Sequence, residues 1–126
     1  SKILFSADAF GTYGALDGGV VDSDMNVEHY WDEMIRYYSN IVGKYGKPVQ
    51  TALKKLSSLE IERICSTHGP VWENNVRQVV GLYDRLSRYE VDRGVCIVYG
   101  SMYGNTAAAA DALAQQIIDI AKRIIG

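Results

Sequence analysis

The sequence is short of cysteine and contains no long apolar run, and both shortages narrow the classes of protein to which it can belong. Only 2 of its 126 residues are cysteines. Cys65 and Cys96 each lie inside an apolar run that is typical of a strand. This predicts buried thiols in a reducing, cytoplasmic compartment, with a disulfide or redox pair as the alternative. No apolar run approaches the roughly 20 residues of a membrane span, so no membrane partner is expected.

The chain also lacks an excess of positive charge. Its formal net charge is −2 at pH 7, which provides no basic surface for nucleic acid or for a membrane. Hydrophobic residues make up 48% of the chain and charged residues 22%, which is the balance of a globular protein, and the length suits one domain of ordinary size. Nucleic-acid partners are therefore not expected.

Apolar periodicity predicts helices and strands that alternate along the chain, and hence an α/β fold. Helices are expected over residues 27–45, 48–56, 74–89 and 106–125, and strands over residues 3–6, 62–66 and 95–99. Asp24 is expected to cap the first helix. It follows a Gly- and Asp-rich loop at residues 10–24, which is long enough to be functional. Pro70 is expected in the first turn of the helix that follows the second strand.

The stretch "VYGSMYGNT", residues 98–106, connects the last expected strand to the last expected helix. Such a turn presents backbone N–H groups at a helix N-terminus, where an anion is favoured. Ser101, Asn105 and Thr106 add side-chain donors, and Gly104 permits an unusual backbone angle. The turn has no lysine, so it is not the loop that holds triphosphates with magnesium. It suits a single phosphate monoester such as that of FMN.

An ordinary strand–turn–helix connection is the alternative for this stretch. Ser101 and Asn105 would then be turn formers, and Thr106 would be the N-cap of the helix. Met102 and Tyr103 would be packing residues. The spacing of the residues alone does not choose between the two interpretations.

Asp8 and His68 each follow the carboxyl end of an expected strand. In α/β folds these strand ends line one rim, where ligands bind, and a carboxylate with an imidazole suits iron. The alternatives are a loop-capping role for Asp8 and a hydrogen-bonded rim role for His68. His29 and Glu33, spaced i, i+4, form a second possible metal pair, but a solvated polar helix face is the favoured interpretation of that spacing.

Three segments of the chain resemble motifs of one family, in the order in which that family has them. "SMYGNT" after "CIVY" resembles the phosphate loop of the flavodoxin-like domain of flavo-diiron proteins. "LFSADAFG" and "ICSTHGPVW" resemble the end of the metallo-β-lactamase-like domain that precedes it. The resemblance implies that residues 1–91 are the C-terminal portion of a metallo-β-lactamase-like αββα domain. Residues 92–126 would be the N-terminal βα unit of a flavodoxin-like domain, its first strand, loop and helix.

The resemblance also implies site residues, cofactors and partners. Asp8 matches the bridging aspartate of the family's di-iron centre, and His68 matches its last histidine ligand. The FMN-binding loop would comprise Ser101, Met102, Tyr103, Gly104, Asn105 and Thr106. In the intact protein, electrons would pass from FMN to the di-iron site, and that site would reduce O2 or NO. The electron donor would be rubredoxin or a flavin reductase, and the protein would be a homo-oligomer.

The resemblance further implies that parts of both sites lie outside the chain. The family's HxExDH motif and a further histidine would lie upstream, and most of the flavodoxin-like sheet downstream. We therefore expect a fragment of an oxidoreductase, inactive in isolation and binding FMN weakly or not at all. Two other functions stay open: a small FMN- or phosphate-binding module without metal chemistry, and a truncated product that oligomerises through unpaired strand edges. Trp72 is expected either near a subunit junction or in the core.

Overall fold

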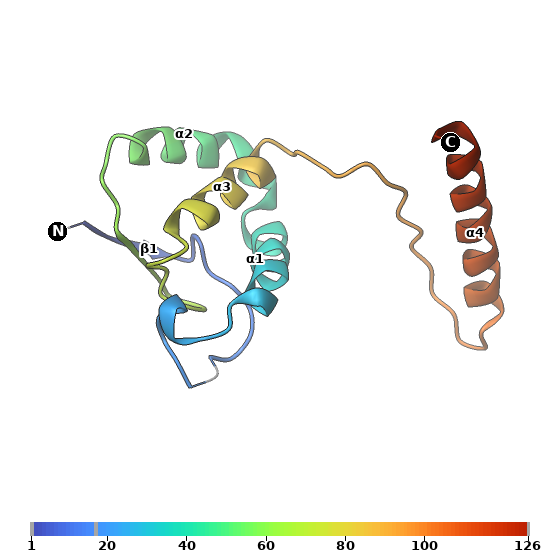
Figure 1. Cartoon of the computed structure of the whole chain (residues 1–126), viewed down its shortest axis with the longest axis horizontal. Coiled ribbons are helices and arrows are strands. Elements are labelled where there is room, and N and C mark those ends of the chain that lie inside the picture. The colour runs from blue at the N-terminus through green and yellow to red at the C-terminus, as the bar shows by residue number, and fades with distance from the viewer. Residues whose placement is uncertain (1, 17, 126) are drawn as a thin grey trace. The chain divides into compact units, whose positions relative to one another are not determined.

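The computed structural model describes residues 2–16 and 18–125, and its elements are labelled in Figure 1. The contacts divide the chain into two compact units, Ser1–Val91 and Asp92–Gly126. The mixture of helices and strands confirms the predicted α/β class. The assignment of the two units to portions of a metallo-β-lactamase-like and a flavodoxin-like domain stays a prediction. Within the described residues, no helix is both long enough and apolar enough to cross a bilayer.

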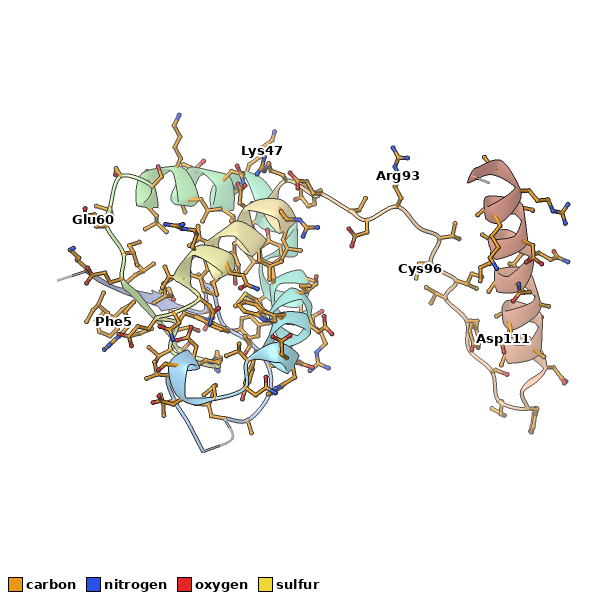
Figure 2. All side chains as sticks on the ribbon, in the orientation of Figure 1. Phe5, Lys47, Glu60, Arg93, Cys96 and Asp111 are labelled. Carbon is orange, nitrogen blue, oxygen red and sulfur yellow. The ribbon has the colours of Figure 1, made fainter. Side chains whose placement is uncertain are left out.

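A parallel pair of strands, β1 (Ile3–Ala7) and β2 (Arg63–Ser66), forms the sheet of the first unit. Both strands were predicted to within one residue at each end. After an irregularity in the register, the pair ends with Ala7 opposite Ser66, so both carboxyl ends lie at one edge of the sheet. Phe5, which points from β1 away from the core, is 80% exposed (Figure 2).

Helices supply most of the remaining structure of the first unit. They are α1 (Glu28–Ile41), α2 (Gly46–Leu56) and α3 (Val76–Ser87), with short 3-10 turns η1 (Asp22–Asp24) and η2 (Gly43–Tyr45). In α1 and α3 the buried side chains recur at steps of three and four, which is the period of one helix face. One core results, made of Phe10, Tyr30, Met34, Tyr38, Ile64, Trp72, Val79 and Tyr83.

The first helix is shorter than the sequence pattern predicts. It begins at Glu28, whose N–H donates to Asn26 Oδ1 at 3.1 Å. Asp24 is therefore not its cap, and that prediction is wrong, because Asp24 already belongs to η1. The helix ends at Ile41, and η2 follows where the α-helix was expected to continue. Glycine at position 43 explains the change, since glycine is a poor helix former.

The prediction that Pro70 starts a helix is also wrong. Pro70 is buried and is followed by two isolated β-bridges, between Val71 and Val21 and between Trp72 and Ile64. These bridges keep the chain extended after Pro70. The helix therefore starts only at Val76, after the expected residue 74.

The second unit consists of a chain segment without regular structure followed by α4 (Asn105–Ile125). The strand expected at residues 95–99 is not formed there. A strand needs a neighbour to satisfy its backbone hydrogen bonds, and the part of this unit that the structure describes offers none. Cys96 is consequently exposed (Figure 2), contrary to the prediction of a buried thiol, and Cys65 is half-buried. Both thiols are free.

Candidate functional site

Asp8 and His68 meet at the edge of the sheet where both strands end. Asp8 directly follows β1, and His68 lies two residues beyond β2. The backbone N–H of Thr67 donates to the carbonyl of Ala7 at 2.9 Å, which joins the two chain segments just past the strands. The nearest approach of the two side chains is 3.6 Å, between His68 Nε2 and Asp8 Oδ1. The predicted juxtaposition on one rim is therefore present in the structure.

Short hydrogen bonds hold both residues in place. The hydroxyl of Thr67 donates to Asp8 Oδ1 at 2.9 Å. The hydroxyl of Ser66 donates to the carbonyl of His68 at 2.8 Å and accepts from the backbone N–H of His68 at 3.2 Å. The Asp8 and His68 side chains nevertheless remain 59% and 57% exposed. A carboxylate oxygen and an imidazole nitrogen are thus available to a ligand from the solvent side.

Tyr37 is a site residue that the sequence pattern did not reveal. It lies on α1, is only 5% exposed, and places its ring centroid 5.8 Å from that of His68. Burial raises the pKa of the Tyr37 hydroxyl, and the nearby negative charge of Asp8, together with a hydrogen bond to it, raises the pKa further. Tyr37 therefore stays protonated and supports the Asp8 carboxylate from the buried side. Its position beside Tyr38 in an aromatic stretch of helix gave no sign of this role.

Two aromatic residues of the core fix the turn that carries Asp8. The N–H of Phe10 donates to the Tyr83 hydroxyl at 2.7 Å, and the indole N–H of Trp72 donates to the Phe10 carbonyl at 2.9 Å. Phe10 has a positive φ of 65°, a conformation that a bulky residue adopts only when its surroundings impose it. Trp72 is thus a core residue. Tyr83 and Trp72 bond the backbone N–H and the carbonyl of Phe10, so the core holds the turn that follows Asp8 in place.

Replacing Tyr83 with phenylalanine should lower the free energy of unfolding by about 2 kcal/mol, because the buried N–H of Phe10 would lose its acceptor. Burial raises the pKa of Tyr83 to about 12, so the hydroxyl is neutral at ordinary pH. Urea denaturation followed by circular dichroism measures the change. Tyr45→Phe is the matched control: Tyr45 is 47% exposed, and this variant should differ from the parent by less than about 0.5 kcal/mol. Equal stability of both variants would contradict the assignment.

Gly69 allows the chain to pass close behind the rim. Its φ is +82°, and a Cβ atom there would lie 2.2 Å from the Thr12 hydroxyl oxygen. The backbone N–H of Thr12 also donates to the carbonyl of His68 at 3.3 Å. No other residue type fits at position 69 without moving Thr12, so the sequence "HGP" follows from the tight packing beneath His68.

The candidate phosphate loop forms a turn at the start of α4. Gly104 has a φ of +84°, as its predicted role requires, and its N–H donates to the Ser101 hydroxyl oxygen at 3.0 Å. The helix begins at Asn105, so Thr106 lies in its first turn and the alternative role of Thr106 as N-cap is wrong. All six loop residues, Ser101, Met102, Tyr103, Gly104, Asn105 and Thr106, are exposed. Their role in binding a flavin phosphate stays a prediction.

The second possible metal pair makes other contacts. The His29 ring lies tilted against Tyr30 with centroids 3.7 Å apart, and the Glu33 carboxylate pairs with Arg36 at 3.1 Å. His29 is exposed, as a solvated face requires, but the Glu33 side chain is only 28% exposed and its Oε2 atom is buried, so the solvated interpretation does not hold for Glu33. Across residues 2–16 and 18–125, no three side chains of His, Cys, Asp or Glu gather closely enough to hold a metal ion by themselves.

The chain is similar to curated proteins over nearly its whole length. It is 36% identical over 121 residues to the anaerobic nitric oxide reductase flavorubredoxin of Aliivibrio fischeri. This match covers 94% of this chain and 24% of that protein. The flavorubredoxin of Escherichia coli O1:K1 is 33% identical over 125 residues, 97% of this chain and 26% of that protein. The chain thus spans about a quarter of the length of these relatives. No family model matches it.

Solved structures show the same similarity. The rubredoxin oxygen:oxidoreductase of Desulfovibrio gigas superposes with a TM-score of 0.83 at 28% identity, covering 94% of this chain and 30% of that one. The flavodiiron protein of Giardia intestinalis superposes with a TM-score of 0.66 at 32% identity, over 71% of this chain and 22% of that one.

Proposed function

Because this chain belongs to the flavo-diiron protein family, we propose that it supplies part of the metal and flavin sites of an oxidoreductase that passes electrons from FMN to a di-iron centre. Family membership implies FMN and a di-iron centre for the intact protein. The reaction of that protein would be the reduction of O2 or NO, since the relatives are named as a nitric oxide reductase and as an oxygen oxidoreductase. The intact protein would be cytoplasmic.

The observation that carries this proposal is the 3.6 Å approach of His68 Nε2 to Asp8 Oδ1. Oxygen and nitrogen donors of this kind fit iron, and both side chains are accessible. Thr67 donates a hydrogen bond to the Asp8 carboxylate, and Tyr37 lies close enough for the charge of Asp8 to raise the pKa of its hydroxyl. Metal ligands are commonly oriented by such outer hydrogen bonds, which set their direction before the metal arrives.

In the intact protein, Asp8 and His68 would each supply one donor, and further ligands would come from other parts of the protein. When bound, the metal centre and the flavin supply the redox chemistry. The residues of this chain hold the donors in place: Thr67 fixes one carboxylate oxygen, and the buried hydroxyl of Tyr37 keeps a proton beside that carboxylate. Residues 101–106 would receive the flavin phosphate at the start of α4, where a helix N-terminus favours an anion.

Partners follow from the same proposal. The relatives' names include rubredoxin, so a rubredoxin, or else a flavin reductase, would deliver electrons to the FMN. The isolated chain would be inactive, because two ligands do not close the coordination of two metal ions. The intact protein would be a homo-oligomer.

Replacing His68 with alanine in the full-length protein should remove at least half of the bound iron, because one metal ion would lose a nitrogen ligand. Elemental analysis of the purified protein measures the iron per chain. Stability should change little, because the imidazole is 57% exposed.

His29→Ala is the matched control, since His29 is the other histidine of the chain and lies in the first turn of α1. It should keep the iron content of the parent. If His68→Ala binds as much iron as the parent, or if both variants lose it equally, the assignment of His68 as a ligand fails.

A further inference from the structure

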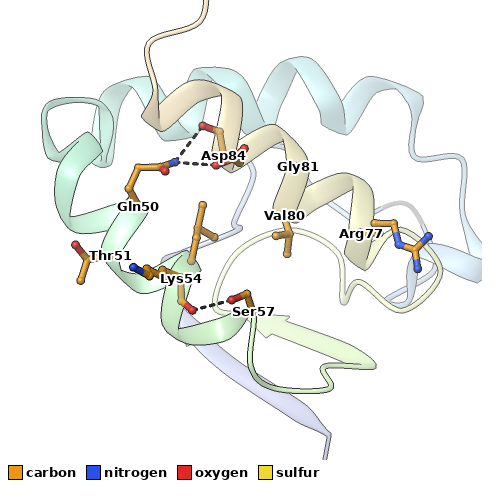
Figure 3. Close-up of a pocket in the computed structure, with 9 residues that line it drawn as sticks. Gln50, Thr51, Lys54, Ser57, Arg77, Val80, Gly81 and Asp84 are labelled. Carbon is orange, nitrogen blue, oxygen red and sulfur yellow. Dashed lines mark hydrogen bonds between the residues drawn. The ribbon is translucent and has the colours of Figure 1, made fainter.

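A groove that is open to solvent lies between helices α2 and α3 on the surface of the first unit (Figure 3). Its volume is about 660 Å³. Leu53 of α2 and Val80 of α3 supply apolar lining, while polar side chains such as Thr51 and Ser57 stand along its edge. The groove lies apart from the rim that carries Asp8 and His68, since none of its lining residues belongs to that rim.

Gly81 of α3 lines this groove and has no side chain to fill it. Glycine inside a helix lowers stability by about 0.5–1 kcal/mol relative to alanine, yet a Cβ atom at Gly81 would meet nothing within 4 Å. Packing within the first unit therefore gives no reason for a glycine. Gly81 also lines a second hollow of about 350 Å³, together with Trp31 and Ile35 of α1. The surface of α3 at Gly81 is thus a saddle between two hollows.

Two cations flank the groove. Lys54 on α2 and Arg77 on α3 both line it (Figure 3), and neither has an ion pair within the described part of the chain. The carboxylate that also lines the groove, Asp84, is already engaged by the Gln50 amide at 2.8 Å and by the Arg88 guanidinium. The net charge presented to an occupant is therefore positive, although the chain as a whole carries −2.

We propose that this groove is a docking site for an acidic amphipathic helix of a partner protein, which crosses α3 at Gly81. Packed helices approach to about 8–10 Å between axes, and a small residue at the crossing permits the closest approach. The apolar side chains of the incoming helix would fill the hollows on either side of Gly81, and its carboxylates would pair with Lys54 and Arg77. This interaction surface goes beyond the proposed redox function and does not depend on it.

The shape of the groove favours a helix over a small molecule. Pockets for small molecules are clefts that bury most of the ligand surface, whereas this groove is open to solvent and shares the lining residue Gly81 with the second hollow. An amphipathic helix laid into an apolar groove is a common mode of peptide recognition. Charge complementarity then selects an acidic partner over a basic one.

The test is binding of a fluorescein-labelled synthetic peptide, about 18 residues long, that is helical, with leucine along one face and glutamate elsewhere. Fluorescence anisotropy measures its affinity for the full-length protein. Gly81→Leu should weaken binding at least tenfold by filling the saddle, and the double variant Lys54→Glu/Arg77→Glu should weaken it at least as much. Lys55→Glu is the matched control, because Lys55 is exposed on α2 but does not line the groove.

Thermal unfolding of each variant separates lost binding from lost folding. Gly81→Leu should melt no lower than the parent, since leucine is the better helix former and its Cβ atom would meet nothing within 4 Å. A version of the peptide with lysine in place of glutamate should bind at least tenfold more weakly. The proposal is overturned if the acidic peptide does not bind, if Gly81→Leu binds it as well as Lys55→Glu does, or if the two peptides bind equally.

Discussion

Replacing Trp72 with alanine is expected to lower the free energy of unfolding of the first unit by about 4 kcal/mol. The indole is fully buried and stacks on Trp31 with ring centroids 5.3 Å apart. Removing a buried aromatic side chain of this size costs about 3–5 kcal/mol through lost contacts and the cavity that remains. The Phe10 carbonyl would also lose its donor. Urea denaturation followed by far-UV circular dichroism measures the loss.

Two further variants separate the contributions of packing and of the hydrogen bond. Trp72→Phe keeps a ring in the core but removes the N–H donor. It should lower the free energy of unfolding by about 1–2 kcal/mol through the lost hydrogen bond, in addition to the loss caused by the smaller side chain. Tyr103→Ala in the second unit removes a side chain that is 86% exposed, and the stability of the first unit should not change. If Trp72→Ala were as stable as Tyr103→Ala, the core would not hold the turn that follows Asp8 in the way described.

The position of the rim that carries Asp8 and His68 could be predicted from the sequence because it depends on local patterns. Two short apolar runs predict two strands, and parallel strands place the residues after their carboxyl ends at one edge. Asp8 follows β1 directly, and His68 lies two residues beyond β2. The prediction needed no knowledge of the helices, so errors in the helix ends left it unaffected.

The residues that support the rim could not be predicted, because their contacts join distant parts of the chain. Tyr37 reaches Asp8 from the middle of α1, and Tyr83 reaches Phe10 across 73 positions in the sequence. An aromatic residue on a helix face predicts burial but not which backbone group it will bond. Only the packing of α1 and α3 against β1 and β2 determines these partners.

The strand expected at residues 95–99 shows a different limit of prediction from sequence. The apolar run "VCIVY" has the composition of a buried strand, but composition does not supply a neighbouring strand. A β-strand is completed by its partner, whereas a helix satisfies its backbone within its own segment. This difference explains why α4 forms close to its predicted bounds in the same unit where the strand does not form.

Asp22 gives the second large effect, and nothing in the sequence beyond an acidic stretch before the first helix predicts it. Asp22 is 4% exposed. It accepts hydrogen bonds from the backbone N–H groups of Glu73, Asn74 and Asn75 at 2.9, 3.1 and 2.8 Å. The side-chain amide of Asn75 adds a fourth at 2.8 Å. Asp22 therefore holds the backbone of the residues just before α3 in place. The helix dipole also favours a negative charge at this end of α3.

Asp22→Ala should lower the free energy of unfolding by about 3 kcal/mol at pH 7, since several N–H groups would lose a charged acceptor. Asp24→Ala is the control from the same turn. The Asp24 side chain is exposed and accepts a hydrogen bond from its neighbour Ser23, so its removal should change stability by less than about 0.5 kcal/mol. Urea denaturation of both variants at pH 7 decides between a structural acceptor and a solvated carboxylate.

The same contacts predict how stability depends on pH. Burial by itself would raise the pKa of Asp22, but the N–H donors of Asn74, Glu73 and Asn75 outweigh it and hold the pKa below its ordinary value. A carboxyl group with a lower pKa in the folded state stabilises the fold above the unfolded pKa of about 3.9 and loses that contribution as pH falls through the folded value. The stability difference between the parent and Asp22→Asn should therefore be constant from pH 7 to about pH 5 and shrink below about pH 4. A difference that stayed constant down to pH 2 would mean that the charge on Asp22 does not contribute.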